Sequence, residues 1–359
     1  MRREVSPHMS TAAVAALLTG VCLAGCTSHS AASSATPPSP GTSAASTSLA
    51  AAATTAAPTS VAATSAAAPV TPAAKNATSL TATTLGWRLP TPLSRMVALA
   101  APGGGIELAG GLLNGDHSSA AVLHLDPVTG TPTSDGRLAT GVHDSAGAVV
   151  GSHMMVYAGG ASAEVAGIQQ LTAGGTATTL GALPEPRSDL VVATVGSKVV
   201  VLGGYTGTAT LADVLVSSDG VHFTVLAKLP VPVRYPAVVV RGTDVYLYGG
   251  DVARQPTDVI QRVSVSAGTA AVVGHLPRAT GHGAAMVLGG SVWLAGGTFP
   301  GGTSSRIYRS TDGVTFTQVG LLPGPRSDMG VVVLDGVGYL IGGETPTRTS
   351  SVVSLRPAA

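Results

Sequence analysis

Short apolar runs alternate with turns that contain glycine along the chain from residue 83 onward. Residues 237 to 240 and 331 to 334 are apolar at every position. Runs of this kind are typical of strands that neighbouring sheets cover on both faces. The pattern therefore predicts a series of short, buried β-strands.

A glycine doublet that follows an apolar run recurs six times, at intervals of 44 to 49 residues. The doublets are Gly110-Gly111, Gly159-Gly160, Gly203-Gly204, Gly249-Gly250, Gly296-Gly297 and Gly342-Gly343. Glycine allows a turn that a side chain would forbid, or lets another backbone approach closely. A fixed period of this length indicates repeated supersecondary units.

The repeats share more than the doublet. Residues 181 to 204 and 320 to 343 each run through Leu-Pro, an arginine, an apolar strand, a turn with glycine and a second apolar strand to Gly-Gly. Beyond two of the doublets, Asp219-Gly220 and Asp312-Gly313 lie between apolar segments. Asp-Gly in that setting is a strong signal for a hairpin turn.

On these motifs the segment from 83 to 359 resembles the kelch repeat of the galactose oxidase-like superfamily. The resemblance implies an all-β fold, a six-bladed β-propeller of four-stranded blades. The last repeat has only three strands, and residues 83 to 89 resemble a lone fourth strand. We expect this N-terminal strand to join the C-terminal blade and close the ring, which leaves no open edge.

The N-terminus has the layout of a secretory signal: Arg2 and Arg3, an apolar stretch from residue 11 to 22, then Leu-Ala-Gly-Cys at 23 to 26. This last motif resembles a bacterial lipobox, which implies acylation of Cys26, palmitate included, and removal of residues 1 to 25. Residues 26 to 82 are almost wholly Ala, Ser, Thr and Pro and are expected to be a disordered tether. We expect the chain to be lipid-anchored on the extracytoplasmic side of the cell membrane.

Composition excludes several classes of protein. The formal net charge is +1, which provides no field that would attract nucleic acid. The only cysteines are Cys22 and Cys26, so the folded part can form neither a disulfide nor a thiolate metal site. The sequence shows no metal-binding pattern, and we expect no cofactor and a monomer.

In a kelch ring, the loop before the first strand of each blade and the loop after each doublet open on one face, around the channel mouth. The first set of loops holds ten candidate ligand-binding residues: Arg95, His143, Asp144, Arg187, Asp189, Arg234, Tyr235, His282, Arg326 and Asp328. The second set offers Asn114, Asp116, His117, Tyr205, Asp251, Arg254, Phe299, Glu344 and Arg348. Arginines that recur in several blades fit a second role equally well, which is to tie one blade to the next.

These features favour a binding module that recognises a protein segment or a cell-envelope glycan through the loop face. One alternative is a carbohydrate-active kelch enzyme, an epimerase or mutarotase, with His143, His282 or Glu185 as its acid or base. The copper chemistry of galactose oxidase requires a cysteine, and none follows Cys26. A further alternative is a structural envelope scaffold without a small ligand.

Overall fold

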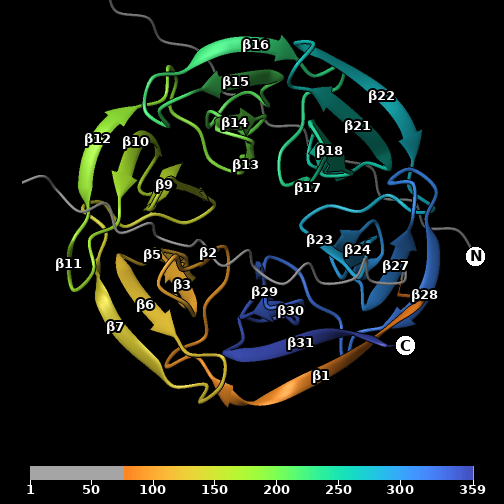
Figure 1. The fold of residues 1–359 in the computed structure, drawn as a ribbon, viewed down its shortest axis with the longest axis horizontal. Coiled ribbons are helices and arrows are strands. Elements are labelled where there is room, and N and C mark those ends of the chain that lie inside the picture. The colour runs from red at the N-terminus through yellow and green to blue at the C-terminus, as the bar shows by residue number, and fades with distance from the viewer. Residues whose placement is uncertain (1–76, 359) are drawn as a thin grey trace, which may run out of the picture. The chain divides into compact units, whose positions relative to one another are not determined.

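The apolar runs before the doublets form the second strand of six β-sheets, which are arranged as the blades of a ring around a central channel (Figure 1). The computed structural model describes residues 77–358. All regular elements in this range are strands. The prediction of an all-β, six-bladed β-propeller is therefore confirmed.

Each of blades 1 to 5 has an inner, two middle and an outer strand, in chain order. Blade 1 has β2 (Val97–Ala100), β3 (Ile106–Ala109), β6 (Ala121–Leu125) and β7 (Pro132–Arg137), and blade 2 has β8 (Ala146–Val150), β9 (His153–Gly160), β10 (Glu164–Gln170) and β12 (Thr178–Ala182). Blade 3 has β13 (Val191–Val195), β14 (Lys198–Leu202), β15 (Asp213–Ser217) and β16 (Thr224–Lys228). Blade 4 has β17 (Ala237–Arg241), β18 (Asp244–Tyr248), β21 (Val259–Ser264) and β22 (Thr269–His275). Blade 5 has β23 (Ala284–Leu288), β24 (Ser291–Ala295), β27 (Arg306–Ser310) and β28 (Thr317–Leu321).

Blade 6 closes the ring by joining both ends of the described chain. Its strands are β29 (Gly330–Leu334), β30 (Val337–Ile341), β31 (Ser351–Ala358) and β1 (Ser79–Arg88). The antiparallel pairing of β1 with β31 runs from Ser79 opposite Ala358 to Thr84 opposite Val353, and Figure 1 shows the two strands side by side at the rim. The predicted closure is confirmed.

The folded part begins earlier than the expected boundary at residue 83. Strand β1 starts at Ser79, so residues 79 to 82 belong to the sheet and not to the tether. Leu80 and Ala82 pack against the core between blades 5 and 6, and this burial extends the strand. The predicted signal and lipobox, and the tether up to residue 76, lie outside the described residues.

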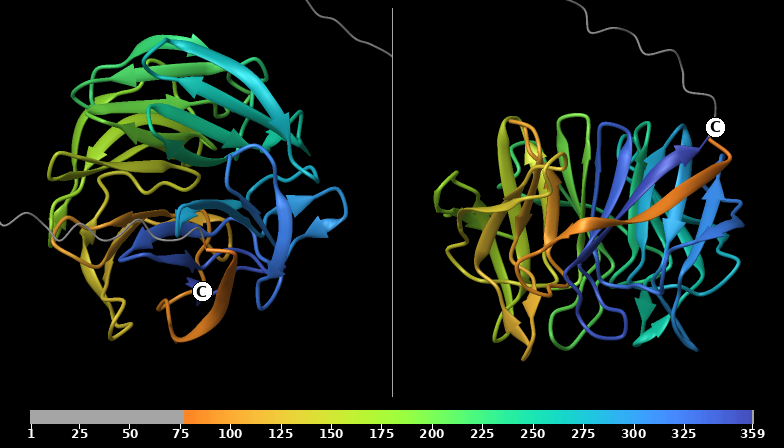
Figure 2. Two further views of the ribbon diagram at one scale, coloured as in Figure 1. Left: turned by 45° about the vertical axis from the view of Figure 1, so that its right-hand side comes forward. Right: turned by 90° about the horizontal axis from the view of Figure 1, so that it is seen from below.

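Several shorter strands complete the fold. Strand β11 (Gly175–Thr176) adds to β7 in parallel, and three small hairpins are formed by β4 (Leu112–Leu113) with β5 (His117–Ser118), β19 (Asp251–Val252) with β20 (Gln255–Pro256), and β25 (Thr298–Phe299) with β26 (Gly302–Thr303). The right-hand view of Figure 2 shows the blade strands running between two loop-bearing faces of the ring. No helix within residues 77–358 is long and apolar enough to cross a membrane.

The core consists of six apolar clusters, one between each pair of neighbouring blades. Between blades 5 and 6, for example, Trp293, Leu340 and Leu355 are fully buried. Burial of one such side chain stabilises the fold by about 2 to 3 kcal/mol. Because the inner and middle strands meet a neighbouring blade on both faces, their runs are apolar at consecutive positions.

The glycine doublets lie where one blade meets the backbone of the next. At Gly203 (φ 60°) a Cβ atom would lie 2.4 Å from the carbonyl oxygen of Val233 in the following blade, so a side chain here would require the backbone to shift. In blade 2 the doublet that the sequence indicated, Gly159-Gly160, is displaced by one residue. The structural equivalents there are Ala158 (φ 55°) and Gly159 (φ 116°), so an alanine occupies a left-handed position that is glycine in the other five blades.

Candidate functional site

One residue from each blade enters the channel mouth in a left-handed backbone conformation. The six residues, which we call the mouth ring, are Arg95, Asp144, Asp189, Tyr235, His282 and Asp328, with φ between 51° and 59°. Non-glycine residues adopt this conformation at a cost that the surrounding structure must offset, and such residues concentrate at functional sites. Each mouth-ring residue lies two positions before the first residue of the inner strand of its blade.

The backbones of the mouth ring form a closed circle of six hydrogen bonds. Each N–H donates to the carbonyl oxygen of the mouth-ring residue in the preceding blade, over 2.8 to 3.2 Å. Arg95 closes the circle, because its N–H donates to the carbonyl of Asp328. The circle uses the backbone N–H and C=O groups of all six residues. It also fixes the positions of their six Cβ atoms around one axis.

The mouth-ring side chains line a cavity of about 140 Å³. A cavity needs about 10 to 15 Å³ to hold one water molecule, so this cavity has room for several. A second cavity of about 240 Å³ shares Met96, Ser145, Leu190 and Met329 with it and continues along the inner strands, where mostly small and apolar residues face the channel. The polar chemistry is therefore confined to the mouth.

Arg95 is the cation of blade 1 and is shared among three carboxylates. Its Nη1 lies 3.1 Å from Asp144 Oδ2, and its Nε lies 3.5 Å from Asp328 Oδ1 and 3.4 Å from Glu344 Oε1. Burial alone would lower the pKa of Arg95, but these carboxylates outweigh burial and raise it. The guanidinium is fixed in its charged form.

His282 lies between two aspartates and stacks on Tyr235. Its Nδ1 is 2.6 Å from Asp328 Oδ1, its Nε2 is 3.3 Å from Asp251 Oδ2, and the two ring centroids are 3.8 Å apart. Burial lowers the pKa of His282, but hydrogen bonds to both carboxylates and their charges raise it to about 10. His282 is thus an imidazolium at neutral pH.

Asp189 has the least complete set of partners in the mouth ring. Arg234 Nη2 lies 2.5 Å from its Oδ2, but neither of its buried oxygens has a hydrogen bond of good geometry within residues 77–358. The hydroxyls of Ser188 and Tyr235 lie near this carboxylate and lower its pKa. Burial and the nearby charge of Asp144 raise the pKa of Asp189 to about 6, although Arg234 opposes them. Burial likewise raises the pKa of Asp144, against the effect of Arg95.

The structure divides the ten sequence candidates into three groups. The mouth ring accounts for six of them. His143 and Arg234 lie beside it: His143 Nδ1 is 2.8 Å from Ser118 Oγ and its Nε2 is 3.6 Å from Asp144, and the Arg234 guanidinium lies over the ring of Tyr205.

Arg187 and Arg326 form the third group and do not line the cavity. Both are buried, and each donates from Nη1 to the carbonyl of the first doublet glycine of its own blade, Gly203 or Gly342. Arg326 also donates to the backbone and side-chain oxygens of Ser351. These two arginines join the entry loop to strands of their own blade. Their contacts are structural, but they are not the ties from one blade to the next that the sequence suggested.

Asp251 and Glu344 contact mouth-ring side chains, yet they lay outside the ten candidates. Isolated β-bridges join Asp251 to Arg234 and Glu344 to Ser327, so the loops after the doublets lie against the entry loops. A count from each doublet would have found the mouth ring: its residues precede the first glycine of the sequence doublet by 14 residues, or by 15 in blades 1 and 2. Their partners follow the doublet directly in blades 4 and 6.

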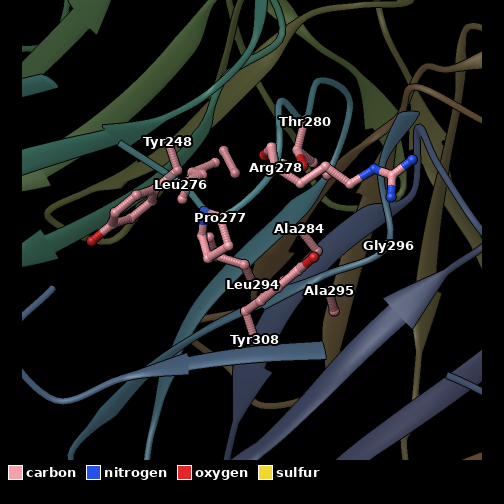
Figure 3. A pocket seen from close by; sticks show the side chains of 12 residues that line it. Tyr248, Leu276, Pro277, Arg278, Thr280, Ala284, Leu294, Ala295, Gly296 and Tyr308 are labelled. Atoms are coloured by element: carbon pink, nitrogen blue, oxygen red, sulfur yellow. Dashed lines mark hydrogen bonds between the residues drawn. The ribbon is translucent and has the colours of Figure 1, made fainter. Parts of the chain in front are cut away.

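A separate, smaller cavity of about 10 Å³ lies between blades 4 and 5. Figure 3 shows Tyr248 at the left, Tyr308 below the centre and the Arg278 side chain extending to the right. Thr280 borders this cavity at the position that Arg187 and Arg326 occupy in blades 3 and 6. Because the volume is about that of one water-sized probe, the cavity is a packing feature and not a second ligand site.

Within residues 77–358, no group of three or more His, Cys, Asp or Glu side chains is arranged to hold a metal ion. The candidate site therefore consists of charged side chains, an imidazolium and a phenol. These groups can donate and accept hydrogen bonds around a small polar ligand.

No protein-family model matches this chain, and no curated protein sequence matches it significantly. Many solved structures do resemble it. One of them, described as the structure of YjhT, a kelch-type propeller, superposes with a TM-score of 0.65 over 75% of this chain and 96% of its own. The two sequences are 14% identical, so the similarity shows the β-propeller fold alone.

Proposed function

We propose that the protein is a binding module whose channel mouth takes one polar, hydroxyl-bearing unit of a larger ligand, most simply the end of a cell-envelope glycan. One observation carries this proposal: each of six blades contributes one polar side chain to a single cavity of about 140 Å³. Sugar hydroxyls both donate and accept hydrogen bonds. They match a lining that mixes carboxylates with Arg95, Tyr235 and His282.

The loop face around the cavity supports recognition of more than one unit. Asp116, which is 82% exposed, and Arg348 belong to the loops after the doublets and pair with each other. A protein segment with a polar end is the other form that the ligand can take. A structural scaffold is less favoured, because the described loop face is charged, and the exposed apolar residues Leu180, Val225 and Leu321 lie on different outer strands.

The experiment is a calorimetric titration of the full chain with wall glycan fragments, neutral sugars and envelope-protein peptides. Asp189→Asn and Tyr235→Phe alter the cavity lining, and Asp244→Asn is the matched control in the β17–β18 turn at the opposite face. Binding that both cavity variants weaken and the control retains supports the proposal. Binding that all three variants retain places the ligand elsewhere and overturns it.

A catalytic role is the second candidate, and one observation favours it. Asp189 and His282 line the same cavity with pKa values moved to about 6 and about 10, and groups with separated pKa values are a feature of acid–base sites. Of the three acid–base residues considered from the sequence, His282 lines the cavity, His143 lies beside it and Glu185 is half-exposed outside it. NMR exchange spectroscopy on any sugar that binds would show catalysis as faster interconversion of its anomers.

We further propose that the blades are kelch-type repeats and that Cys26 anchors the protein to the extracytoplasmic side of the cell membrane. The motifs at residues 23 to 26 and the recurring doublets support these assignments. Mass spectrometry of the N-terminal peptide should find acyl chains on Cys26. A Cys26→Ser variant should then leave the membrane fraction, and an unmodified N-terminus in the wild type would contradict the anchor.

A further inference from the structure

The carboxylates around the channel mouth outnumber the cations. Five carboxylates, Asp144, Asp189, Asp251, Asp328 and Glu344, are paired with four cations, Arg95, Arg234, His282 and Arg348. Arg95 is shared by three of these carboxylates and His282 by two, and Arg234 is the cation that contacts Asp189. The mouth therefore has an excess of negative charge.

Asp144 and Asp189 are neighbours in the mouth ring. The N–H of Asp189 donates to the carbonyl of Asp144 over 2.8 Å, so the two side chains start from adjacent points of the circle. Both carboxylates are at most 5% exposed, and both line the cavity. Two carboxylates buried side by side repel each other unless a cation or a proton lies between them.

The Oδ1 atom of Asp189 is the second, independent indication of a ligand. It is buried within the cavity lining and has no hydrogen bond of good geometry among the described residues, although the hydroxyls of Ser188 and Tyr235 lie near this carboxylate. Leaving a buried charged acceptor unpaired is costly, and such atoms in native structures need an explanation. A donor supplied by a ligand would complete the hydrogen bonding of this atom.

We propose that the channel mouth binds a protonated primary amine, held between the carboxylates of Asp144 and Asp189. An ammonium has three N–H donors and one positive charge, which match the unpaired oxygen and the excess negative charge. This inference rests on the proposed function of the cavity, and it names the chemical group of the ligand that the cavity recognises. The amine belongs either to an amino sugar or to a lysine side chain, and the test separates these sources.

Proton linkage supports the same assignment. Burial and Asp144 raise the pKa of Asp189 to about 6, so below that pH a proton occupies the place of the ammonium. The other charged and titratable groups that face Asp189 are Arg234 and Tyr235, and Arg95 and His143 reach it only through Asp144. Amine binding should therefore release a proton, and the affinity should fall by up to about tenfold per pH unit below pH 6.

The experiment titrates the full chain with glucosamine, N-acetylglucosamine, glucose and Nα-acetyl-lysine amide at pH 5 and pH 7. At pH 7 we expect at least one of the two amines to bind at least tenfold more tightly than glucose, with N-acetylglucosamine no better than glucose. The amine that binds identifies the source. Asp189→Asn should remove this preference for an amine. Asp144→Asn is tested in its place if the first variant does not fold. The control variant Asp244→Asn should retain the preference.

Each other outcome overturns the inference in a distinguishable way. Equal affinity for glucose and glucosamine, with no binding of the lysine derivative, would remove the amine preference and leave the proposed glycan site intact. A response to Ca²⁺ that equals the response to the amines would replace an organic cation with a metal. Absence of binding by all four ligands and by the larger glycans would overturn both proposals together.

Discussion

The imidazole of His282 donates to the carboxylate of Asp328 over 2.6 Å, and it does so across the boundary between blade 5 and blade 6. The backbone N–H of Asp328 in turn donates to the carbonyl of His282. Two neighbouring blades are thus joined twice at one point, through the backbone and through an ion pair. The stability of the ring should therefore depend on the charge of this histidine.

The pH dependence of stability should report the His282 imidazolium. Because its folded-state pKa of about 10 lies above its ordinary value of 6.5, the contribution is complete below pH 6.5 and disappears as pH rises toward 10. This contribution to the free energy of unfolding is on the order of a few kcal/mol. In urea unfolding, the stability difference between wild type and His282→Gln should shrink across this window, and a difference independent of pH would contradict the ion pair.

Arg326 should matter for stability and not for binding. Arg326→Ala removes donors from the carbonyls of Gly342 and Ser351 and opens a cavity beside the doublet, so we expect a loss of about 3 kcal/mol. Thermal unfolding measures the loss, and titration of the folded variant should give an unchanged ligand affinity. Asp189→Asn should show the opposite pattern, with affinity reduced and stability retained.

Much of this architecture could be predicted from the sequence, because it rests on local rules. The doublets, the apolar runs and the missing fourth strand of the last repeat specify six blades and the closure by β1. The displaced doublet at Ala158 was missed because three successive residues, Ala158 to Gly160, offer two possible pairs, and only the backbone dihedral angles distinguish them.

The site was less predictable than the fold. The sequence located all six mouth-ring residues in the entry loops, but it did not separate Asp189 from Arg187, two positions away. The separation depends on the left-handed conformation at Asp189, which directs that side chain to the channel while Arg187 points into the blade. Contacts such as His282 with Asp251 depend on how two loops meet in the closed ring.

The doublet in blade 2 allows a matched test of why glycine recurs. Gly203→Ala would place a Cβ atom 2.4 Å from the Val233 carbonyl oxygen, and we expect a cost above about 2 kcal/mol from the clash and the left-handed backbone. Ala158 already occupies the equivalent position, so Ala158→Gly should change stability by less than about 1 kcal/mol. Chemical denaturation of both variants measures the two changes in stability, and changes of equal size would contradict the prediction.

Glu107 should be a source of instability at alkaline pH. This carboxylate is buried 3.2 Å from His124, and burial together with the charge of Asp135 raises its pKa to about 7. Since the unfolded chain ionises near the ordinary value of 4.5, the folded state is favoured at low pH and loses this advantage as pH rises through 7. The Glu107→Gln variant should therefore be more stable to unfolding than the wild type by about 2 kcal/mol at pH 8, and by little at pH 4. A gain of the same size at both values would contradict the assignment.

Closure by β31 should make the ring unfold as one unit. Val353 and Leu355 are at most 2% exposed and belong to the core that β1, β30 and blade 5 share. Leu355→Ala should cost about 3 kcal/mol, and deletion of residues 352 to 359 should lower the midpoint of a single transition, because it leaves β1 and β30 with unpaired edges. Val225→Ala, at a side chain that is 62% exposed on β16, is the control and should have no measurable effect. Calorimetry distinguishes the cases: an unchanged midpoint with a small, separate low-temperature transition would mean that the ends fray locally, and that closure does not hold the blades together.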